Sequence, residues 1–329
     1  MEVQLGAGFS KSIWIERPCV AKVRRNPLEP RPEGCCTIRM LWSGISRGTE
    51  RLVFEGRVPE SEYAAMRCPA QEGDFPAPVK YGYCAVGLVE DGPADFVGKT
   101  VFTLHPHQDR FHAPVSMLNP LPESLPGRRA VLAANMETAL NAIWDSGAGP
   151  GDRILVVGAG ALGLLMAFVL AALPGAEVSV ADPDGSRAPV VTAFGARFLG
   201  RETPRDDHDV VFHTSSSAAG LATAIAAAGR EATIVEASWY GAGSVPAPLG
   251  GRFHSHRLRL VSSQVGAIPA ARAARWDFRR RMQTALRLLA DDRLDLLITA
   301  EVAFDDLPDR MPEILASGAP GIVTAVRYG

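Results

Sequence analysis

The sequence predicts an α/β fold in which a β-rich N-terminal part precedes a doubly wound sheet of parallel strands. Hydrophobic residues make up 47% and charged residues 21% of the 329 residues, which excludes a disordered chain and a coiled coil. Aromatic residues are only 7%, whereas there are 32 glycines, a balance that suits close helix–strand packing. From residue 153 onward, strand-like runs alternate with helical stretches, which is typical of βαβ units.

The first 126 residues are predicted to form short strands and loops. Strand-like runs cover residues 35–42, 83–89 and 100–104, and a short helix is expected over 60–68. Residues 24–34 contain three prolines and are expected to be irregular. Pro114, Pro120, Pro122 and Pro126 mark a stiff linker at the end of this part.

Beyond the linker, a helix is predicted over 130–146. The expected strands are 153–157, 177–181, 197–199, 209–213, 232–237 and 257–263, and the clearest helices between them are 161–173 and 217–228. Helical connections of this length imply parallel pairing, and six such strands match the doubly wound dinucleotide-binding fold, the Rossmann fold. A long helix with arginines on its exposed face is expected over 271–290, followed by short strands and one helix.

A glycine-rich turn follows the first of these strands. It reads Gly158-Ala-Gly160-Ala-Leu162-Gly163. Gly158 permits a tight turn, Gly160 lets the backbone approach a pyrophosphate, and Gly163 lets the helix lie close to the strand. N–H groups at the start of the helix favour phosphate. The turn, Leu162 included, is therefore predicted to bind a dinucleotide. A buried strand–turn–helix without a ligand is the alternative; a methyltransferase is disfavoured by the six-strand pattern.

Two features concern the choice of cofactor. Asp182 ends the second strand, 19 residues after Gly163, where a carboxylate accepts from both ribose hydroxyls and repels a 2′-phosphate. This favours NAD, while the nearby Arg187 keeps NADP possible. Thr214 and Ser215 follow the strand that ends at His213, and we expect them to touch the nicotinamide ribose.

Composition narrows the partners and the compartment. Lys+Arg minus Asp+Glu is 34 − 36 = −2 with interspersed charges, so neither nucleic acid nor an acidic membrane surface is expected as a partner. Residues 154–176 carry no charged side chain, but their glycines and Pro174 fit a strand and a buried helix better than a membrane span. The five cysteines are an odd, sparse set within about the first quarter of the chain, which predicts no disulfide framework. Residues 1–20 show no signal peptide, so a cytoplasmic protein is expected.

The chain resembles the medium-chain dehydrogenase/reductase family, the alcohol dehydrogenase-like group, over nearly its whole length. The resemblance is carried in order by Gly44-Ile45-Ser46-Arg47, residues 75–82, 147–152, 182–187 and 194–196, and the ending 298–307. It implies a GroES-like catalytic domain at 1–126, a Rossmann NAD(P)-binding domain at 127–269 and a return to the catalytic domain at 270–329. It further implies a homodimeric dehydrogenase or reductase that transfers hydride between a nicotinamide and a small alcohol or carbonyl substrate.

The sequence departs from the zinc-dependent members of that family. They have Cys where this chain has Ser46, and Gly-His-Glu where it has Gly82-Tyr83-Cys84. The third ligand would fall near Ala134 or Asn135, and the structural-zinc lobe is missing. A hydroxyl and a phenol are poor ligands for Zn²⁺. The resemblance therefore implies a zinc-free member, similar over residues 43–50 to the subgroup of bacteriochlorophyllide-type dehydrogenases.

Without zinc, side chains must handle the proton and the substrate oxygen. We expect Ser46 and Thr49 to donate and relay protons and Tyr83 to donate to the substrate oxygen. Lys80 would lower the pKa of that phenol if it points inward. A packing role for Tyr83 is equally open. The resemblance gives Arg47 a contact with the cofactor pyrophosphate; a solvated surface arginine is the alternative.

His105 and His107 form a second polar cluster. Residues two apart share a face of a strand, so the two imidazoles are able to meet as an acid/base pair, a metal site or a substrate contact. A zinc-free oxidoreductase is the favoured hypothesis. A metal-dependent alcohol dehydrogenase using His105 and His107, and a non-catalytic cofactor-binding protein, remain as alternatives. The substrate and the direction of the reaction are not specified by the sequence.

Overall fold

The computed structural model describes residues 8–329, which fall into two compact units. Unit 1 comprises Met1–Ala134 and Leu286–Gly329, and unit 2 comprises Asn135–Ala285. The first seven residues, part of the predicted domain 1–126 and of the segment 1–20 searched for a signal peptide, lie outside the described residues. Unit 2 begins and ends later than the predicted cofactor domain 127–269. Its last part belongs there because the buried Arg281 binds Glu137 within the same unit.

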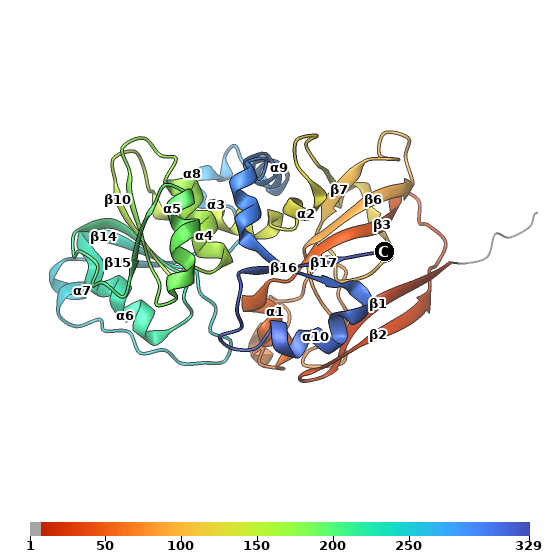
Figure 1. Ribbon diagram of the computed structural model, residues 1–329, viewed down its shortest axis with the longest axis horizontal. Helices are drawn as coiled ribbons and strands as arrows, with labels where there is room; N and C mark the ends of the chain where they lie inside the picture. Colours follow the sequence, from red (N-terminus) through yellow and green to blue (C-terminus); the bar gives the residue numbers. More distant parts are fainter. Residues whose placement is uncertain (1–7) are drawn as a thin grey trace, which may run out of the picture. The chain divides into compact units, whose positions relative to one another are not determined.

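Unit 2 is built on a six-stranded parallel sheet, as predicted (Figure 1). The order β12-β11-β10-β13-β14-β15 changes direction at β10, as in a doubly wound sheet. Its strands are β10 (Arg153–Val157), β11 (Glu177–Ala181), β12 (Arg197–Gly200), β13 (His208–His213), β14 (Ala228–Glu236) and β15 (Arg259–Ser262).

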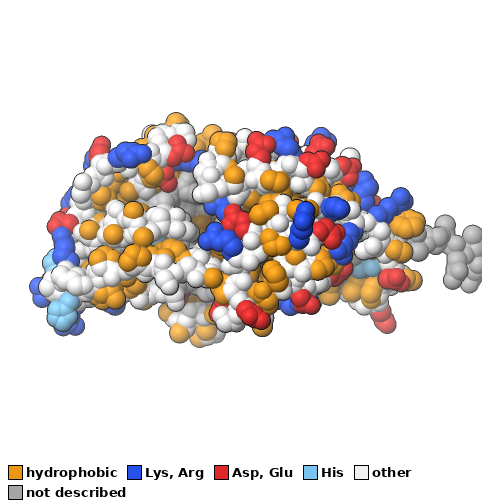
Figure 2. Space-filling model, turned by 90° about the horizontal axis from the view of Figure 1, so that it is seen from below, with side chains coloured by type: hydrophobic (Ala, Val, Ile, Leu, Met, Phe, Trp, Pro, Cys, Tyr) orange, Lys and Arg blue, Asp and Glu red, His pale blue; other side chains and the backbone are white. Residues whose placement is uncertain are grey.

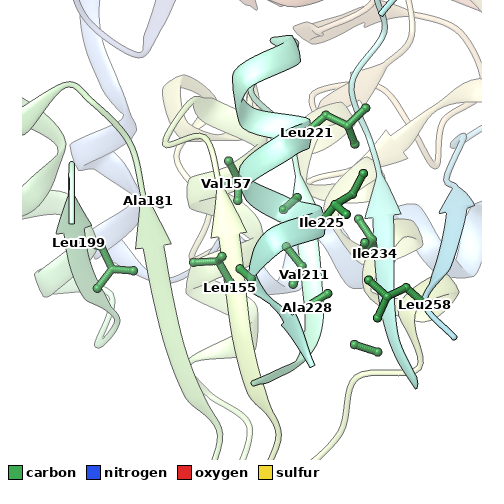
Figure 3. Packing of buried hydrophobic residues seen from close by; sticks show 13 residues of the cluster. Leu155, Val157, Ala181, Leu199, Val211, Leu221, Ile225, Ala228, Ile234 and Leu258 are labelled. Carbon is green, nitrogen blue, oxygen red and sulfur yellow. The ribbon is translucent and has the colours of Figure 1, made fainter. Parts of the chain in front are cut away.

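Helices cover both faces of the central strand β10. Leu155 and Val157 pack with Leu221 and Ile225 of helix α6 (Ala218–Ala227) in one buried cluster (Figure 3). Helix α4 (Ala161–Leu170) also packs on β10, and Ile154 and Val156, which alternate with the first pair along the strand, are buried too. Burial on both faces explains why 154–157 is an unbroken apolar run. The other helices of unit 2 are α3 (Ala133–Ser146), α5 (Ala188–Ala193), α7 (Arg252–Ser255), α8 (Ala270–Ala273) and α9 (Phe278–Leu288).

Unit 1 contains two mostly antiparallel sheets. The four-stranded sheet has the order β2-β1-β5-β4 and the seven-stranded sheet the order β16-β17-β3-β6-β7-β9, with β8 paired to β3. Their strands are β1 (Phe9–Arg17), β2 (Val20–Pro27), β3 (Cys35–Gly44), β4 (Glu72–Gly73), β5 (Val79–Lys80), β6 (Ala85–Asp91), β7 (Thr100–Thr103), β8 (Arg110–Pro114), β9 (Asn119–Pro120), β16 (Ile298–Ala303) and β17 (Val323–Arg327). The helices are α1 (Arg47–Phe54), α2 (Gly127–Ala130) and α10 (Leu307–Ile314).

The C-terminal segment completes the larger sheet of unit 1. Strand β17 pairs antiparallel with β3, which places Val326 opposite Ser43. Strand β16 then adds parallel to β17. The core beneath this sheet includes Ile38, Met40 and Phe111. The chain therefore returns at its end to the sheet that it began, and residues 43–46, where β3 leads into α1, are held from both sides.

Three predicted elements differ from the structure. The helix expected over 60–68 is only the short 3₁₀ turn Glu60–Glu62, and β2 extends to Pro27, into the segment expected to be irregular. The helix expected over 271–290 is broken into α8 and α9, because Asp277 Oδ1 accepts from the Arg280 N–H at 2.7 Å and so caps a new start. The prediction that the arginines there face solvent is wrong for Arg281, which is 1% exposed.

The surface agrees with the small net charge. Lys, Arg, Asp and Glu side chains are interspersed with apolar ones over the face drawn in Figure 2. Over residues 8–329, every helix is too short or too polar to span a bilayer. The uncharged run 154–176 consists instead of β10, the glycine-rich turn, α4 and a turn over 171–176.

Candidate active site

The glycine-rich turn after β10 has three distinct environments. Gly158 has φ +110°, and a Cβ there would lie 2.8 Å from Thr214 Oγ1. A Cβ on Gly163 would lie 2.0 Å from the carbonyl oxygen of Gly158. A Cβ on Gly160 would meet nothing within 4 Å. Gly158 and Gly163 are thus needed for the turn itself, while Gly160 borders open space in front of the N-terminus of α4, where a pyrophosphate fits.

Asp182, at the end of β11, is connected to the same turn. Its Oδ2 accepts from the Ala159 N–H at 2.6 Å and its Oδ1 from the Asp184 N–H at 2.8 Å. The partly exposed carboxylate thus stands beside the open space at Gly160. Arg187 lies 3.1 Å from Asp184 Oδ2 in an ion pair, and its side chain is 14% exposed.

A cavity of about 620 Å³ opens at the carboxyl edge of the sheet in unit 2. It lies over β11, β10 and β13, three neighbouring strands. Its lining includes Gly158, Asp182, Arg201, Ser215, Gly220 and Arg252. Of the predicted cofactor residues, Gly158, Asp182 and Ser215 line this cavity. The other six do not: Arg47, Gly160, Leu162, Gly163, Arg187 and Thr214. In open α/β sheets, ligands bind outside the carboxyl ends of the strands at such a change of strand order.

Thr214 and Ser215 follow β13 and differ in orientation. The Thr214 hydroxyl donates to the carbonyl oxygens of Gly158 at 2.9 Å and Val157 at 3.2 Å, so it braces the glycine-rich turn. Ser215 lines the cavity, and its Oγ is 2.7 Å from His213 Nε2. The expected contact with a nucleotide therefore suits Ser215 better than Thr214.

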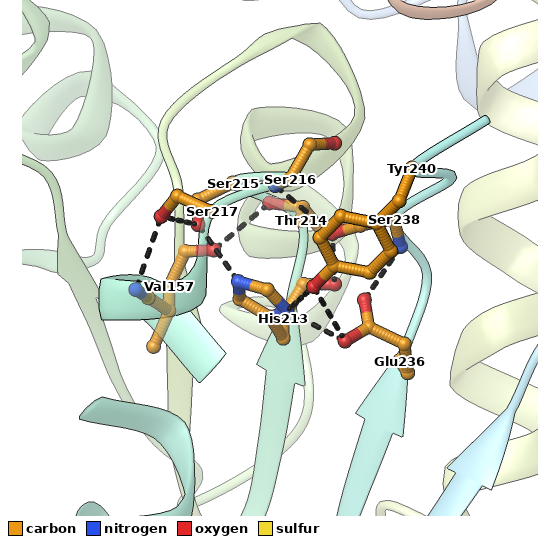
Figure 4. Close-up of polar contacts among 10 residues, drawn as sticks. Val157, His213, Thr214, Ser215, Ser216, Ser217, Glu236, Ser238 and Tyr240 are labelled. Atoms are coloured by element: carbon orange, nitrogen blue, oxygen red, sulfur yellow. Dashed lines mark hydrogen bonds and ion pairs between the residues drawn. The ribbon is translucent and has the colours of Figure 1, made fainter. Parts of the chain in front are cut away.

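His213 is at the centre of a polar network at the ends of β13 and β14 (Figure 4). It is fully buried, and its Nδ1 is 2.7 Å from Glu236 Oε2. The Tyr240 hydroxyl donates to the same carboxylate at 3.1 Å. Sequence reasoning did not single out Glu236. Its position at the end of the strand next to His213 was the available signal, because neighbouring parallel strands end at the same edge.

A second buried network lies in unit 1 around Glu50, which is 3% exposed. Its Oε1 accepts from the Ser46 N–H at 2.7 Å, and its Oε2 is 3.0 Å from His107 Nε2. His107 Nδ1 is 2.7 Å from Ser43 Oγ, which in turn is 3.0 Å from the Tyr328 hydroxyl. The structure thus brings Ser46 and His107 onto one carboxylate. Sequence reasoning did not identify Glu50, Ser43 or Tyr328 as site residues, although Ser43 and Glu50 are the first and last residues of the segment that carries Ser46.

Tyr83 lies beside this network and is half-buried. Burial raises the pKa of its phenol well above the usual value, and hydrogen bonds with Ser46 and Thr49 oppose the shift only in part. Gly82, with φ +129°, lets the His107 ring come within 3.0 Å of where a Cβ would stand. The structure therefore brings together Ser46, Thr49 and Tyr83, three hydroxyl groups beside a buried carboxylate–imidazole pair.

Lys80 and Arg47 have other partners. The Lys80 ammonium is buried in an ion pair with Glu72 and donates to Gln108 Oε1 at 2.7 Å. Lys80 is not among the groups that shift the pKa of Tyr83, so the expected lowering by this ammonium is not seen. The Arg47 guanidinium donates to the carbonyl oxygens of Gly321, at 2.8 Å, and Ala319, so it joins α1 to the segment before β17. The pyrophosphate contact of Arg47 stays a prediction.

The structure does not favour a metal site at His105 and His107. The His105 ring stacks on Phe111 at 3.5 Å, its Nδ1 donates to the Pro106 carbonyl, and burial lowers the pKa of this imidazole to about 3. Both nitrogens of His107 have protein partners. Within residues 8–329, no three His, Cys, Asp or Glu side chains are grouped closely enough to hold a metal.

The positions at which the resemblance would place catalytic zinc ligands also fit a metal poorly. Ser46 presents a hydroxyl there, and Tyr83 would have to ionise although its pKa is raised. Thiolate, imidazole and carboxylate are the donors that zinc prefers.

Comparison with known proteins supports the fold. No protein-family model matches the sequence. The chain is 27% identical over 207 residues to D-guloside 3-dehydrogenase of Escherichia coli K12, a match that covers 58% of this chain and 59% of that protein. The match thus spans less than two thirds of that relative.

Solved structures match over almost the whole chain. A putative zinc-binding dehydrogenase from Sinorhizobium meliloti 1021, bound to NADP, has a TM-score of 0.78 at 16% identity, with 97% of this chain and 99% of that chain covered. A structure described as a short chain alcohol dehydrogenase from E. coli CFT073, complexed with NADH, has a TM-score of 0.77 at 17% identity, with 98% and 100% covered. The chain therefore has the fold of such dehydrogenases, a GroES-like domain and a Rossmann domain.

Proposed function

We propose that the chain is an NAD(P)-dependent oxidoreductase of the medium-chain dehydrogenase/reductase family that acts on an alcohol or carbonyl substrate without a catalytic zinc ion. The observation that carries this proposal is the glycine-rich turn. Gly158 and Gly163 are required by contacts, Gly160 borders open space, and Asp182 stands beside them. That combination fits a dinucleotide pyrophosphate with a ribose next to it.

The residues proposed to hold the cofactor are Gly158, Gly160, Asp182 and Ser215. When bound, the nicotinamide accepts or supplies the hydride. The Asp182 carboxylate favours NAD, because it accepts from ribose hydroxyls and repels a 2′-phosphate. The solved relatives bind NADP in one case and NADH in another, so NADP remains the alternative.

The proton is proposed to be handled by Tyr83. Because burial raises the pKa of its phenol, the group stays protonated at neutral pH and donates to a developing substrate alkoxide. Ser46 and Thr49, which hydrogen-bond to it, orient the phenol and relay the proton. Glu50 positions Ser46 through the backbone N–H, and His107 holds Glu50 in place.

The substrate is proposed to be a secondary alcohol of a sugar or polyol, or the corresponding ketone. The likeness to a guloside 3-dehydrogenase supports this class. Residues 43–50 support a place in the zinc-free subgroup that resembles bacteriochlorophyllide-type dehydrogenases. A homodimer also stays part of the proposal, with β15 as the sheet edge available to a second copy; light scattering checks it.

Cofactor binding is the first test. Titration of the protein with NADH and NADPH, followed by the fluorescence of the reduced nicotinamide, is expected to show saturable binding that is tighter for NADH. Asp182→Ala should narrow the difference between the two cofactors. If neither binds to folded protein, the proposal is wrong. Tight binding together with no turnover on a broad alcohol and carbonyl panel would instead support a non-catalytic binding protein.

A further inference from the structure

The network around His213 is not used by the proposed proton chemistry, yet it reaches the cavity of unit 2. Glu236, His213 and Ser215 form a continuous line of hydrogen bonds from the end of β14 to the cavity lining (Figure 4). Both links are 2.7 Å long. His213 is 0% exposed, so its two ring nitrogens see protein partners rather than bulk water.

The carboxylate at one end sets the direction of the hydrogen bonds. Burial alone would raise the pKa of Glu236. The hydrogen bonds from His213 and from the Ser238 N–H lower it by a larger amount, so the pKa lies below its usual value. An ionised carboxylate only accepts, so His213 Nδ1 carries a proton and donates. In the neutral imidazole Nε2 is then an acceptor, and the Ser215 hydroxyl donates to it.

Ser217 completes the line at the other end. Its Oγ accepts from the Gly220 N–H at 3.0 Å, as the cap of α6, and lies 2.9 Å from Ser215 Oγ. The Ser217 hydroxyl is therefore able to donate to Ser215. Ser215 then donates a hydrogen bond to His213 and accepts one from Ser217. One lone pair of the Ser215 Oγ is left to accept a hydrogen bond from a ligand.

The start of α6 restricts this arrangement sterically. A Cβ on Gly220 would lie 2.0 Å from Ser215 Oγ and 2.7 Å from His213 Nε2, so the helix backbone touches both groups. Ser215 follows β13, Gly220 lies in α6 and Asp182 follows β11, and all three line the same cavity. The cavity thus presents an acceptor on Ser215 as well as the acceptor carboxylate of Asp182.

We propose that Ser215 is a specificity residue for the nucleotide, and that Glu236 and His213 are positioning residues that fix its Oγ as a hydrogen-bond acceptor toward the cavity. The inference rests on the proposed function. The ligand group selected is a hydrogen-bond donor of a nucleoside, either a ribose hydroxyl or the exocyclic amine of adenine. A phosphate or a keto oxygen at the same place would face a lone pair and bind less well.

Glu236→Gln exchanges donor and acceptor in the hydrogen bonds that join residue 236, His213 and Ser215, with almost no change in the shape of the side chain. The Ser238 N–H, which donates to Oε1 at 2.8 Å, keeps the amide oxygen on its side and turns the NH₂ toward His213 and Tyr240. Nδ1 must then accept, Nε2 carries the proton, and Ser215 turns its own hydrogen to the cavity. We expect the NADH dissociation constant to rise about tenfold, the loss of one hydrogen bond. Binding of a ligand with an acceptor at that place should not weaken.

Three dinucleotides, all measured at the same pH, separate the two sources of the donor. If the ribose hydroxyl is the donor, Glu236→Gln lowers the preference for NADH over NADPH. If the adenine amine is the donor, it lowers the preference for NADH over the hypoxanthine analogue of NADH. Tyr240→Phe removes a donor to Glu236 without reversing the line, so both preferences should change less than about twofold.

The outcomes separate this inference from the function on which it rests. Binding of neither NADH nor NADPH to the unaltered protein would overturn both. Two results with folded Glu236→Gln would overturn the inference alone, if the unaltered protein binds NADH normally. One is that both cofactor preferences are unchanged, and the other is that the affinities for all three dinucleotides fall equally. If that variant does not fold, ¹⁵N NMR of the unaltered protein decides: a proton on Nδ1 of His213 and none on Nε2 is expected, and a proton on Nε2 would contradict it.

Discussion

By the resemblance of its sequence to the medium-chain dehydrogenases, Tyr83 stands where the zinc-dependent members have a histidine. Its phenol has a raised pKa and hydrogen bonds to Ser46 and Thr49. Those surroundings suit a group that keeps its proton until the substrate oxygen takes it. Replacement of the imidazole thus changes the proposed way of stabilising charge, from a metal ion to a hydrogen-bond donor.

Tyr83→Phe removes that donor and keeps the ring. We expect the rate constant for carbonyl reduction to fall about 100-fold or more, since the general acid is lost, with NADH affinity unchanged. Tyr81→Phe is the matched control: its hydroxyl donates to the Met66 carbonyl, so stability should fall by about 1 kcal/mol without loss of turnover. Equal rates for Tyr83→Phe and the unaltered enzyme would assign Tyr83 to packing.

His105 gives a pH-dependent contribution to stability. Burial lowers its pKa to about 3 from 6.5, so between these values the unfolded chain binds a proton that the folded chain does not. The free energy of unfolding should therefore fall as pH falls below about 6.5, by up to about 1.4 kcal/mol per pH unit from this group. Urea unfolding of His105→Gln at several pH values should show a shallower slope; identical slopes would contradict the assignment.

At the residue scale, sequence reasoning found the groups whose role is local. Gly158, Gly160 and Gly163 act within one turn, so their spacing carries the information. The bond between Glu50 and His107 joins residues 57 positions apart, which no spacing rule reveals. The expected effect of Lys80 on the pKa of Tyr83 is not seen for a related reason. Lys80 is close to Tyr83 along the chain, but its ammonium forms an ion pair with Glu72.

At the scale of elements, β10, the glycine-rich turn and α4 follow one another directly, and the glycines of the turn have different roles in folding and in cofactor binding. Gly160→Ala should leave the melting temperature unchanged, since a Cβ there meets nothing within 4 Å and φ is −77°. It should weaken NADH binding about tenfold or more, because the methyl group intrudes on the pyrophosphate. Gly163→Ala should instead destabilise the fold, with a Cβ 2.0 Å from a carbonyl oxygen. Normal NADH affinity of Gly160→Ala would place the pyrophosphate elsewhere.

Helix α9 is fixed to α3 by a buried ion pair. Arg281 is 1% exposed and donates to Glu137 Oε1 at 3.0 Å, and burial raises the pKa of Glu137. Arg281→Leu leaves a buried carboxyl group without its partner and should cost about 3–5 kcal/mol in chemical denaturation. The exposed Arg280→Leu on the same helix should cost less than about 1 kcal/mol. A similar decrease in the free energy of unfolding for both variants would contradict the role of the buried ion pair of Arg281.

The strands of unit 2 were predictable, because burial on both faces leaves continuous apolar runs such as 154–157. The break between α8 and α9 was not, because one side-chain cap at Asp277 decides it against a pattern that continues through residues 271–290. In unit 1 the strands β4, β5 and β9 have two residues each, too few for a periodic pattern.

For the whole molecule, the six-stranded parallel sheet and the return of β17 to β3 give the chain the architecture of nicotinamide-dependent dehydrogenases. By the resemblance of the sequence, the departures from the zinc-dependent pattern lie at Ser46, at Tyr83 and in the missing structural-zinc lobe. The fold is thus shared while the proposed chemistry at its site differs, which only turnover of the intact chain is able to test.

The most direct measurement is reduction of the ketones of sugars and polyols with NADH by protein purified with a chelator and analysed for bound metal. We expect turnover of at least one such ketone at metal contents far below one ion per chain, unchanged by added zinc and strongly reduced in Tyr83→Phe. Activity that is lost on chelation and restored by zinc would contradict this expectation.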